Sequence, residues 1–441
     1  MTVKFMMNLF ALLCSSAAIA SAVPNISGVE VAQDETSKLV TISYCLSDAP
    51  GIVTFSLETN ASEDVWLPID GSDLAGAWGD VNMLVTPKEE GKHTIFWQPN
   101  ISNPAFSMEK GNVRAVLTAW QEEYPPDYMV IDLNCGRPAD GGPLAHGHSF
   151  YADANQLPFG ISNKMYKTSK LVMRRIPVSP DLKWVMGQAD VDNATPHYVT
   201  LTNSFYIGVY EITYGQWENI CHNIPSTTSK YGYTNFTDVS SMPVCGVMFT
   251  EVRGSSKGLG WFSDKDAVTR RDVDANTPIS NLRLRTGILF DLPTEAQWEY
   301  ACRAGESTSF NNGTDSIGET AWYKQNSLAT TVRGDKLRAI HEVGTRNSSN
   351  NWGLYDMHGN VREMCLDVWR NDLGADDVKE PLGAPYTGVA NTDKFRVFRG
   401  GCFSDSADAC RSSYRTYTNV KAHYTSNGFR VVCPYPLGLN W

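Results

Sequence analysis

The stretch Trp352-Gly-Leu-Tyr-Asp-Met-His-Gly-Asn-Val-Arg-Glu-Met-Cys-Leu-Asp367 carries the strongest structural signal in this chain. Gly359-Asn360 predicts a tight turn, because both residue types tolerate a positive φ. Asp356 and Glu363 flank the turn, and the main-chain carbonyls of Gly359 and Val361 lie between them. Carboxylate and carbonyl oxygens on one tight loop suit a hard cation such as calcium. The alternative is an ordinary turn with solvated acids, and spacing alone favours that alternative.

The composition describes a folded, exported protein rather than a nucleic-acid binder. The 441 residues are 42% hydrophobic and 19% charged, and they include 12 Trp, 19 Tyr and 35 Gly. This length predicts two or three domains, and the aromatic and glycine content favours a loop-rich fold over a helical bundle. The net charge of -11 argues against a general phosphate-backbone binder, which needs a basic face.

The N-terminal residues 1–22 have the pattern of a secretory signal peptide. Lys4 supplies the positive charge, Phe5 to Leu13 is apolar, and Ala20-Ser-Ala22 is a cleavage site of the A-x-A type. The apolar run is short for a membrane span, and no later segment has the length to cross a bilayer. We therefore expect a secreted, periplasmic or cell-surface protein, in a compartment where cysteines pair.

Residues 23–138 have the pattern of a β-sandwich of the immunoglobulin or fibronectin type. Short runs of alternating apolar and polar residues, such as Leu39 to Tyr44 and Ile52 to Leu57, are separated by Gly, Pro, Asn and Asp. No chemistry is expected in this domain, which we interpret as a spacer or adhesive module. Residues 139–168 are predicted to be a linker, because small and polar residues dominate and Pro and Gly are frequent.

Residues 169–436 are predicted to form an α+β domain without an internal repeat, followed by a tail at 437–441. A helix is expected from Thr213 to Ile220, with Thr213 as its N-cap. The clearest helix follows Thr294 and ends near Gly305, with Trp298 and Ala301 on the same face. The later strands are predicted at Phe395 to Phe398 and Gly428 to Val432.

Six segments of this second domain resemble the formylglycine-generating enzyme, or sulfatase-modifying-factor, superfamily, and they occur in that family's order. The resemblance covers about residues 171–434 and implies a C-type-lectin-like fold. The six segments are Phe205 to Thr213, Met242-Pro-Val244, Leu292 to Gly305, Trp352 to Asp367, Arg399-Gly-Gly401 and Asn427-Gly-Phe-Arg430.

The resemblance implies a structural calcium site in the opening stretch. The ligands would be the Asp356 and Glu363 side chains and the Gly359 and Val361 carbonyls, in agreement with the spacing argument. A second calcium site of the family corresponds to a position near Asn326. His358, next to this turn, is interpreted as an exposed turn residue.

The catalytic residues match the family less closely. The oxidising enzymes place two cysteines after the Arg-Gly-Gly strand, where soft thiolates suit copper(I). The second of these positions is Cys410, but the first is Asp405, a hard carboxylate. Cys402 is nearby in a different register, so copper chemistry would require Cys402 and Cys410 to converge. Two positions where the family commonly has Trp are occupied by Arg362 and Met364.

The alternative role of the cysteines is disulfide bonding. Ten cysteines are present, and removal of Cys14 with the leader leaves an odd number. Pairing cannot be read from sequence, so Cys45–Cys135, Cys221–Cys245 and Cys365–Cys410 are candidate pairs, and the resemblance implies Cys302–Cys433. Cys402 then remains as the odd thiol.

The segment Ser404 to Ser426, called here the terminal loop, has a composition suited to an adaptable binding surface. It combines Tyr with Ser, Asn and Asp, and the equivalent region lines the ligand site in lectin-like folds. A solvated loop with packed Tyr is an equal alternative, and the two arginines could form structural ion pairs instead. The candidate ligand-binding residues are Asp405, Arg411, Tyr414, Arg415 and Tyr417.

Two functional hypotheses follow. The first is an exported protein whose copper chemistry is altered or lost and which binds a protein, peptide or glycan through residues 402–427. The second is an active copper oxidase that converts a sulfatase cysteine to formylglycine with Cys410 and Cys402. A purely structural surface module is the third possibility.

Overall fold

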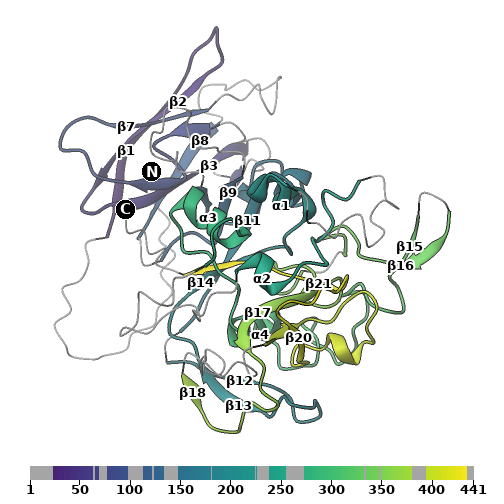
Figure 1. Ribbon diagram of the computed structural model, residues 1–441. Coiled ribbons are helices and arrows are strands. Elements are labelled where there is room, and N and C mark those ends of the chain that lie inside the picture. The colour runs from purple at the N-terminus through teal and green to yellow at the C-terminus, as the bar shows by residue number, and fades with distance from the viewer. Residues whose placement is uncertain are drawn as a thin grey trace.

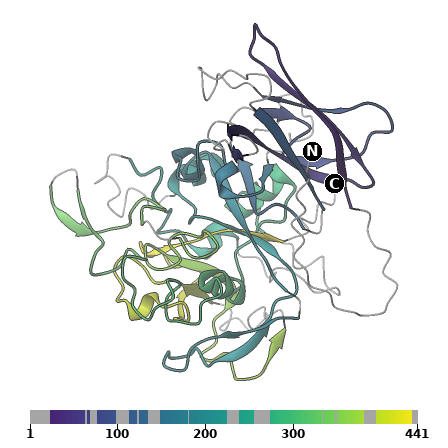
Figure 2. The same cartoon turned by 180° about the vertical axis from the view of Figure 1, so that it is seen from behind.

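The computed structural model separates into an N-terminal all-β part and a larger mixed part (Figures 1 and 2). The signal peptide, Cys135 and the 437–441 tail lie outside the described residues. The residues that the structure describes are 23–62, 65–68, 77–97, 113–121, 124–133, 148–179, 181–223, 225, 238–254, 273–331, 334–346, 349–379 and 394–434.

Two antiparallel sheets form the N-terminal part and share one apolar core. Val40, Ile42 and Trp97 from the first sheet pack with Val53 and Phe55 from the second. The inward residues alternate with outward ones, as the period-2 pattern predicts. The first sheet contains β1 (Asn25–Gln33), β2 (Val40–Ser47), β7 (His93–Trp97) and β5 (Ala77–Gly79), in that order, and the second contains β4 (Val65–Pro68), β3 (Gly51–Ser62) and β6 (Met83–Val85), with β8 (Val113–Trp120) also paired to β3.

The boundary between the two parts differs from the prediction. β9 (Tyr128–Asp132) lies within the range 23–138 expected for the sandwich, but it pairs with β10 (His148–Tyr151) and β11 (Lys170–Ile176). The residues after 148 are therefore not a linker but begin the second part. Met129 and Ile131 of β9 are buried in the largest core cluster of this part, and that burial explains why the strand joins it.

The second part is built around two main sheets. One has the order β10-β9-β11-β14-β22, and the other has the order β20-β19-β17-β21. Smaller sheets are β12-β13-β18 and the hairpin β15-β16. The bounds are β12 (Lys183–Met186), β13 (His197–Thr200), β14 (Phe205–Gly208), β15 (Leu328–Thr330), β16 (Lys336–Arg338), β17 (Arg362–Val368), β18 (Val378–Lys379), β19 (Phe395–Arg399), β20 (Thr416–Asn419), β21 (Asn427–Gly428) and β22 (Val432–Pro434).

Both predicted helices form, and their caps are the predicted threonines. Thr213 caps α1 (Tyr214–Cys221), and Thr294 caps α4 (Glu295–Arg303), each by accepting a bond from the third helical amide. Trp298 and Ala301 are buried on one face of α4. Two further helices, α2 (Phe249–Val252) and α3 (Pro278–Thr286), were not predicted. The strand expected from Gly428 to Val432 is present only at its ends, as β21 and β22.

Candidate functional site

The opening stretch forms a buried turn, as its sequence predicts. Gly359 and Asn360 have φ values of +78° and +52°. A Cβ atom at position 359 would lie 2.1 Å from the carbonyl oxygen of Trp322, so only glycine fits. The buried Glu211 carboxylate holds the turn, because it accepts from the Asn360 side chain (2.7 Å) and from the Val361 amide (3.0 Å). Glu211 therefore supports the predicted calcium loop, although the sequence argument did not identify it.

The two expected calcium carboxylates have different surroundings. Asp356 accepts from the Gly344 amide through Oδ2 (2.6 Å), whereas its Oδ1 is buried and has no hydrogen-bond partner. Burial raises the pKa of Asp356 to about 6. Glu363 is held by Arg430, with Nη2–Oε1 at 2.7 Å, and by the Trp298 indole N–H at 2.7 Å. Both Glu363 oxygens are therefore engaged, and only the orphaned Asp356 Oδ1 remains open to a hard cation.

The calcium expectation therefore rests on the Asp356 carboxylate and main-chain carbonyls, because Glu363 is paired with Arg430. No three His, Cys, Asp or Glu side chains within the described ranges group closely enough to hold a metal. Glu211, Asp356 and Glu363 nevertheless share one buried environment with Arg430. Burial and the neighbouring carboxylates raise the pKa of Glu211 well above its usual range. Asn326 uses both ends of its amide in its own turn, with Tyr323 N and Ala321 O, so a second calcium site there remains only a prediction.

Asp405, which the resemblance places at the first copper-ligand position, forms a two-point ion pair with Arg362. Arg362 Nη2 lies 2.6 Å from Oδ1 and Nε lies 2.9 Å from Oδ2. Asp405 also accepts from the Cys402 amide at 3.0 Å. Arg362 is one of the two positions where the family commonly has Trp. Two of the three departures expected from the resemblance, Arg362 and Asp405, therefore contact each other, and both Asp405 carboxylate oxygens are already engaged.

Cys402 and Cys410 lie together beside this ion pair. Both are buried, and the Cys402 amide is within hydrogen-bonding reach of the Cys410 thiol. The Cys410 Sγ lies 2.6 Å from the point that a Cβ at Gly401 would occupy, so the positive φ and bare Cα of Gly401 make room for it. Burial raises the pKa of both thiols. Both side chains are therefore thiols at neutral pH, whereas the thiolate is the form that binds a metal.

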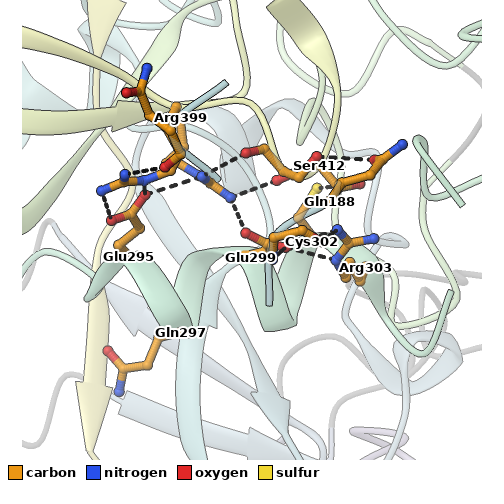
Figure 3. Close-up of polar contacts among 12 residues, drawn as sticks. Gln188, Glu295, Gln297, Glu299, Cys302, Arg303, Arg399 and Ser412 are labelled. Carbon is orange, nitrogen blue, oxygen red and sulfur yellow. Dashed lines mark hydrogen bonds and ion pairs between the residues drawn. The ribbon is translucent and has the colours of Figure 1, made fainter. Parts of the chain in front are cut away.

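A network of buried charges fastens the terminal loop to α4. Arg399 contacts Glu295 and Glu299 and donates to the Ser412 and Ser413 carbonyls (Figure 3). Arg303 pairs with Glu299 at 2.9 Å, and Arg415 pairs with Glu295, with Nη2–Oε2 at 2.9 Å. These side chains are all buried. The network therefore sets the position of the loop that is expected to carry function.

A second buried polar group lies under the loop. His358 donates through Nδ1 to the Cys410 carbonyl (2.7 Å) and accepts through Nε2 from the Asn311 amide (3.1 Å). Burial lowers the pKa of His358 to about 4, so the imidazole is neutral. Its interpretation as an exposed turn residue is wrong, because the residues around Asn311 and Cys410 cover it.

Residues 180–434 match the sulfatase-modifying factor enzyme 1-like domain. This chain belongs to that family. Among similar proteins, the chaperone protein LppX of Paenibacillus barcinonensis is 28% identical over 275 residues, which are 58% of this chain and 90% of that protein. The formylglycine-generating enzyme of Bos taurus is 23% identical over 343 residues, which are 70% of this chain and 87% of that enzyme. Among solved structures, Treponema denticola variable protein 1 aligns with a TM-score of 0.44 and 23% identity, covering 60% of this chain and 95% of that one.

This sulfatase-modifying factor family member contains no disulfide among its described residues. Free thiols are present at Cys45, Cys221, Cys302, Cys365, Cys402, Cys410 and Cys433. Three expected pairs, Cys221–Cys245, Cys302–Cys433 and Cys365–Cys410, are therefore not formed. Cys302 and Cys365 belong to one core cluster, whereas Cys433 and Cys410 belong to two others, so packing separates the partners. The fourth pair, Cys45–Cys135, includes a residue outside the described ranges.

The predicted ligand-binding residues of this family member separate into buried and surface groups. Arg415 is buried, pairs with Glu295 and packs on the Trp369 ring, which is the structural ion pair that was the alternative to ligand binding. Arg411 pairs with Asp190 and Asp408 near the surface. Tyr417 is 50% exposed and packs against Trp369. Asp405 and Tyr414 are partly buried.

Proposed function

We propose that this protein is an exported member of the family that has lost copper-oxidase chemistry and binds a ligand through residues 402–427. The Arg362–Asp405 ion pair carries this proposal, because it occupies the position of the first thiolate ligand. A carboxylate held by a guanidinium is a poor ligand for copper(I), which prefers soft, polarisable sulfur. Copper therefore does not fit the described residues, and we derive no reaction step through it.

The surface of the terminal loop supports a binding role. Tyr417 and Tyr424 are 50% and 55% exposed, and the buried network on α4 holds the loop that presents them. Rigid, half-exposed tyrosines supply contact area at low conformational cost. The N-terminal sandwich, of the immunoglobulin or fibronectin type in this proposal, serves as a spacer or adhesive module. In the described part of the chain, no helix combines the length and apolarity that crossing a membrane requires.

A double substitution should restore a copper site if the ion pair is what removed it. Asp405→Cys with Arg362→Trp replaces a hard, paired carboxylate by a thiol near Cys410, and we expect copper(I) affinity to rise at least ~100-fold, about 2.7 kcal/mol. The measurement is competition with a copper(I) chelator. The matched control is Asp408→Cys with Arg411→Trp, because this neighbouring Asp–Arg pair lies nearer the surface. Equal affinity in both variants would contradict the assignment.

The competing function is an active copper oxidase that uses Cys402 and Cys410. The placement of the two thiols beside each other favours it. The wild-type chain, incubated with copper and a Cys-x-Pro-x-Arg peptide, is expected to form no aldehyde. Aldehyde formation that disappears in Cys410→Ser would establish the oxidase and overturn the binding proposal.

We also propose that Asp356 holds calcium in the opening stretch, and this has its own test. Asp356→Asn keeps the size of the side chain but removes its charge, so the calcium-dependent rise in melting temperature should disappear. Glu363 is a poorer choice for substitution, because its loss would also leave Arg430 unpaired. Thermal unfolding with calcium and with a chelator measures the effect. If the melting temperature of the wild type is the same with calcium and with the chelator, the calcium site is refuted.

A further inference from the structure

The hairpin of β15 and β16 projects from the second part as an isolated two-stranded ribbon (Figures 1 and 2). Its strands are Leu328–Thr330 and Lys336–Arg338, and each pairs only with the other among the described strands. A ribbon of this kind has main-chain donors and acceptors along both edges, where another strand can add.

The hydrogen-bond pattern shows which groups face outward. The Thr331 amide donates to the Asp335 carbonyl, and the Ala339 amide donates to the Ser327 carbonyl. Directly opposed pairs in an antiparallel ladder alternate between bonded and non-bonded. The pairs Leu328↔Arg338 and Thr330↔Lys336 are therefore the non-bonded ones, and their amides and carbonyls point away from the hairpin. Lys336 and Arg338 present the outward groups on the β16 edge.

The same two residues give this edge a positive charge. Lys336 and Arg338 are exposed and, because side chains alternate along a strand, lie on one face, while Asp335 points to the other. Neither forms an ion pair with a described residue. Surface cations elsewhere do, as in Lys88–Asp80, Lys164–Asp238 and Lys183–Asp377. Leu328, 52% exposed and opposite Arg338, adds an apolar contact on this face.

The base of the hairpin is fastened to the candidate site. Ser327 Oγ donates to the Phe403 carbonyl at 2.6 Å, and the Lys324 amide donates to the Asp405 carbonyl at 2.9 Å. Arg338 Nε donates to the Lys324 carbonyl at 2.8 Å. The base of the hairpin is therefore in contact with the segment that contains Cys402 and Asp405.

We propose that the β16 edge binds an extended acidic peptide segment of a partner protein as an added strand. The partner's backbone would bond to the outward groups of Lys336 and Arg338, and its carboxylates would pair with their side chains. Charge complementarity favours this occupant, because Lys336 and Arg338 are exposed cations that form no ion pair with a described residue. The inference goes beyond the proposed function, because the β16 edge lies outside residues 402–427.

The test uses a labelled peptide that alternates Glu with Val, and fluorescence anisotropy with the full chain. Lys336→Glu with Arg338→Glu should weaken binding about tenfold or more, a loss of ~1.4 kcal/mol. The matched control is Lys38→Glu with Lys379→Glu, which makes the same charge change at exposed positions outside the hairpin. This control protein should bind the peptide like the wild type. Lys336→Gln with Arg338→Gln provides a milder variant if the reversal perturbs folding. No binding by the wild type, or equal binding by the hairpin variants, would overturn the proposal.

A second peptide separates strand addition from simple charge attraction. The same sequence with alternate N-methylated amides keeps its carboxylates but loses main-chain donors, so its binding should also fall about tenfold. Equal binding of the two peptides would overturn strand addition. These results are independent of the copper and aldehyde measurements, so the hairpin inference can fail while the loss of oxidase chemistry stands.

Discussion

Glu299→Gln should destabilise the second part of the protein by roughly 3–5 kcal/mol and lower its melting temperature by about 10 °C. Glu299 is fully buried on α4 and accepts from Arg303, from Arg399 and from the Gly187 amide. The amide substitution removes the charge that offsets two buried guanidiniums, and it points an N–H group at donors. A buried cation without its partner is the costliest product of such a change.

The control and the pH dependence make this prediction specific. Glu218→Gln lies on the exposed face of α1 and should change stability by no more than about 0.5 kcal/mol. Burial raises the pKa of Glu299, but Arg399 and Arg303 lower it more, so it lies below the usual carboxyl value. Its contribution is therefore present above the unfolded-state pKa and is lost as pH falls through the folded-state pKa. The difference between wild type and variant should shrink in acid; a constant difference would contradict the assignment.

Arg430→Met should have an effect of similar size, roughly 3–5 kcal/mol or more. Arg430 is fully buried and donates to Glu363, to the Gly208 and Val209 carbonyls and to the Tyr355 carbonyl. It therefore joins β14, β17 and the opening stretch through one side chain. It is also the cation that faces the buried carboxylates of Glu211, Asp356 and Glu363.

A double substitution distinguishes loss of charge balance from loss of packing. Arg430→Met with Glu363→Gln should be less destabilised than the sum of the two single variants, because no unpaired charge remains between them. Chemical denaturation of the four proteins gives the coupling energy. Arg114→Met, which removes an exposed partner of Glu58, should cost no more than about 1 kcal/mol. Additive effects at Arg430 and Glu363 would show that packing alone is lost.

The sequence predicted the parts of the fold that depend on local chemistry. Thr213 and Thr294 satisfy the amides of the first helical turn, so each marked the start of its helix. Gly359 and Asn360 tolerate a positive φ, so they marked the central turn. The order of the six family segments identified the second domain, which the match over residues 180–434 shows.

Some buried charges stand in a sequence context that indicates a partner. Three of these charged residues lie in largely apolar runs of sequence that form a buried strand or the segment at its end: Glu211, Arg399 and Arg430. A lone charge in such a run requires an opposite charge elsewhere in the fold. The sequence could therefore have indicated that partners exist, but it could not have named them.

Only the tertiary structure decided which residues meet. It paired Asp405 with Arg362, 43 positions apart, and it put Cys410 beside Cys402 rather than beside Cys365. It also shows that β9 belongs to the second part rather than to the sandwich, and that His358 is buried. Helix caps and turns depend on atoms a few residues apart, so the sequence determines them directly. Ion pairs, thiol neighbours and sheet membership depend on chain segments that only the folded core brings into contact.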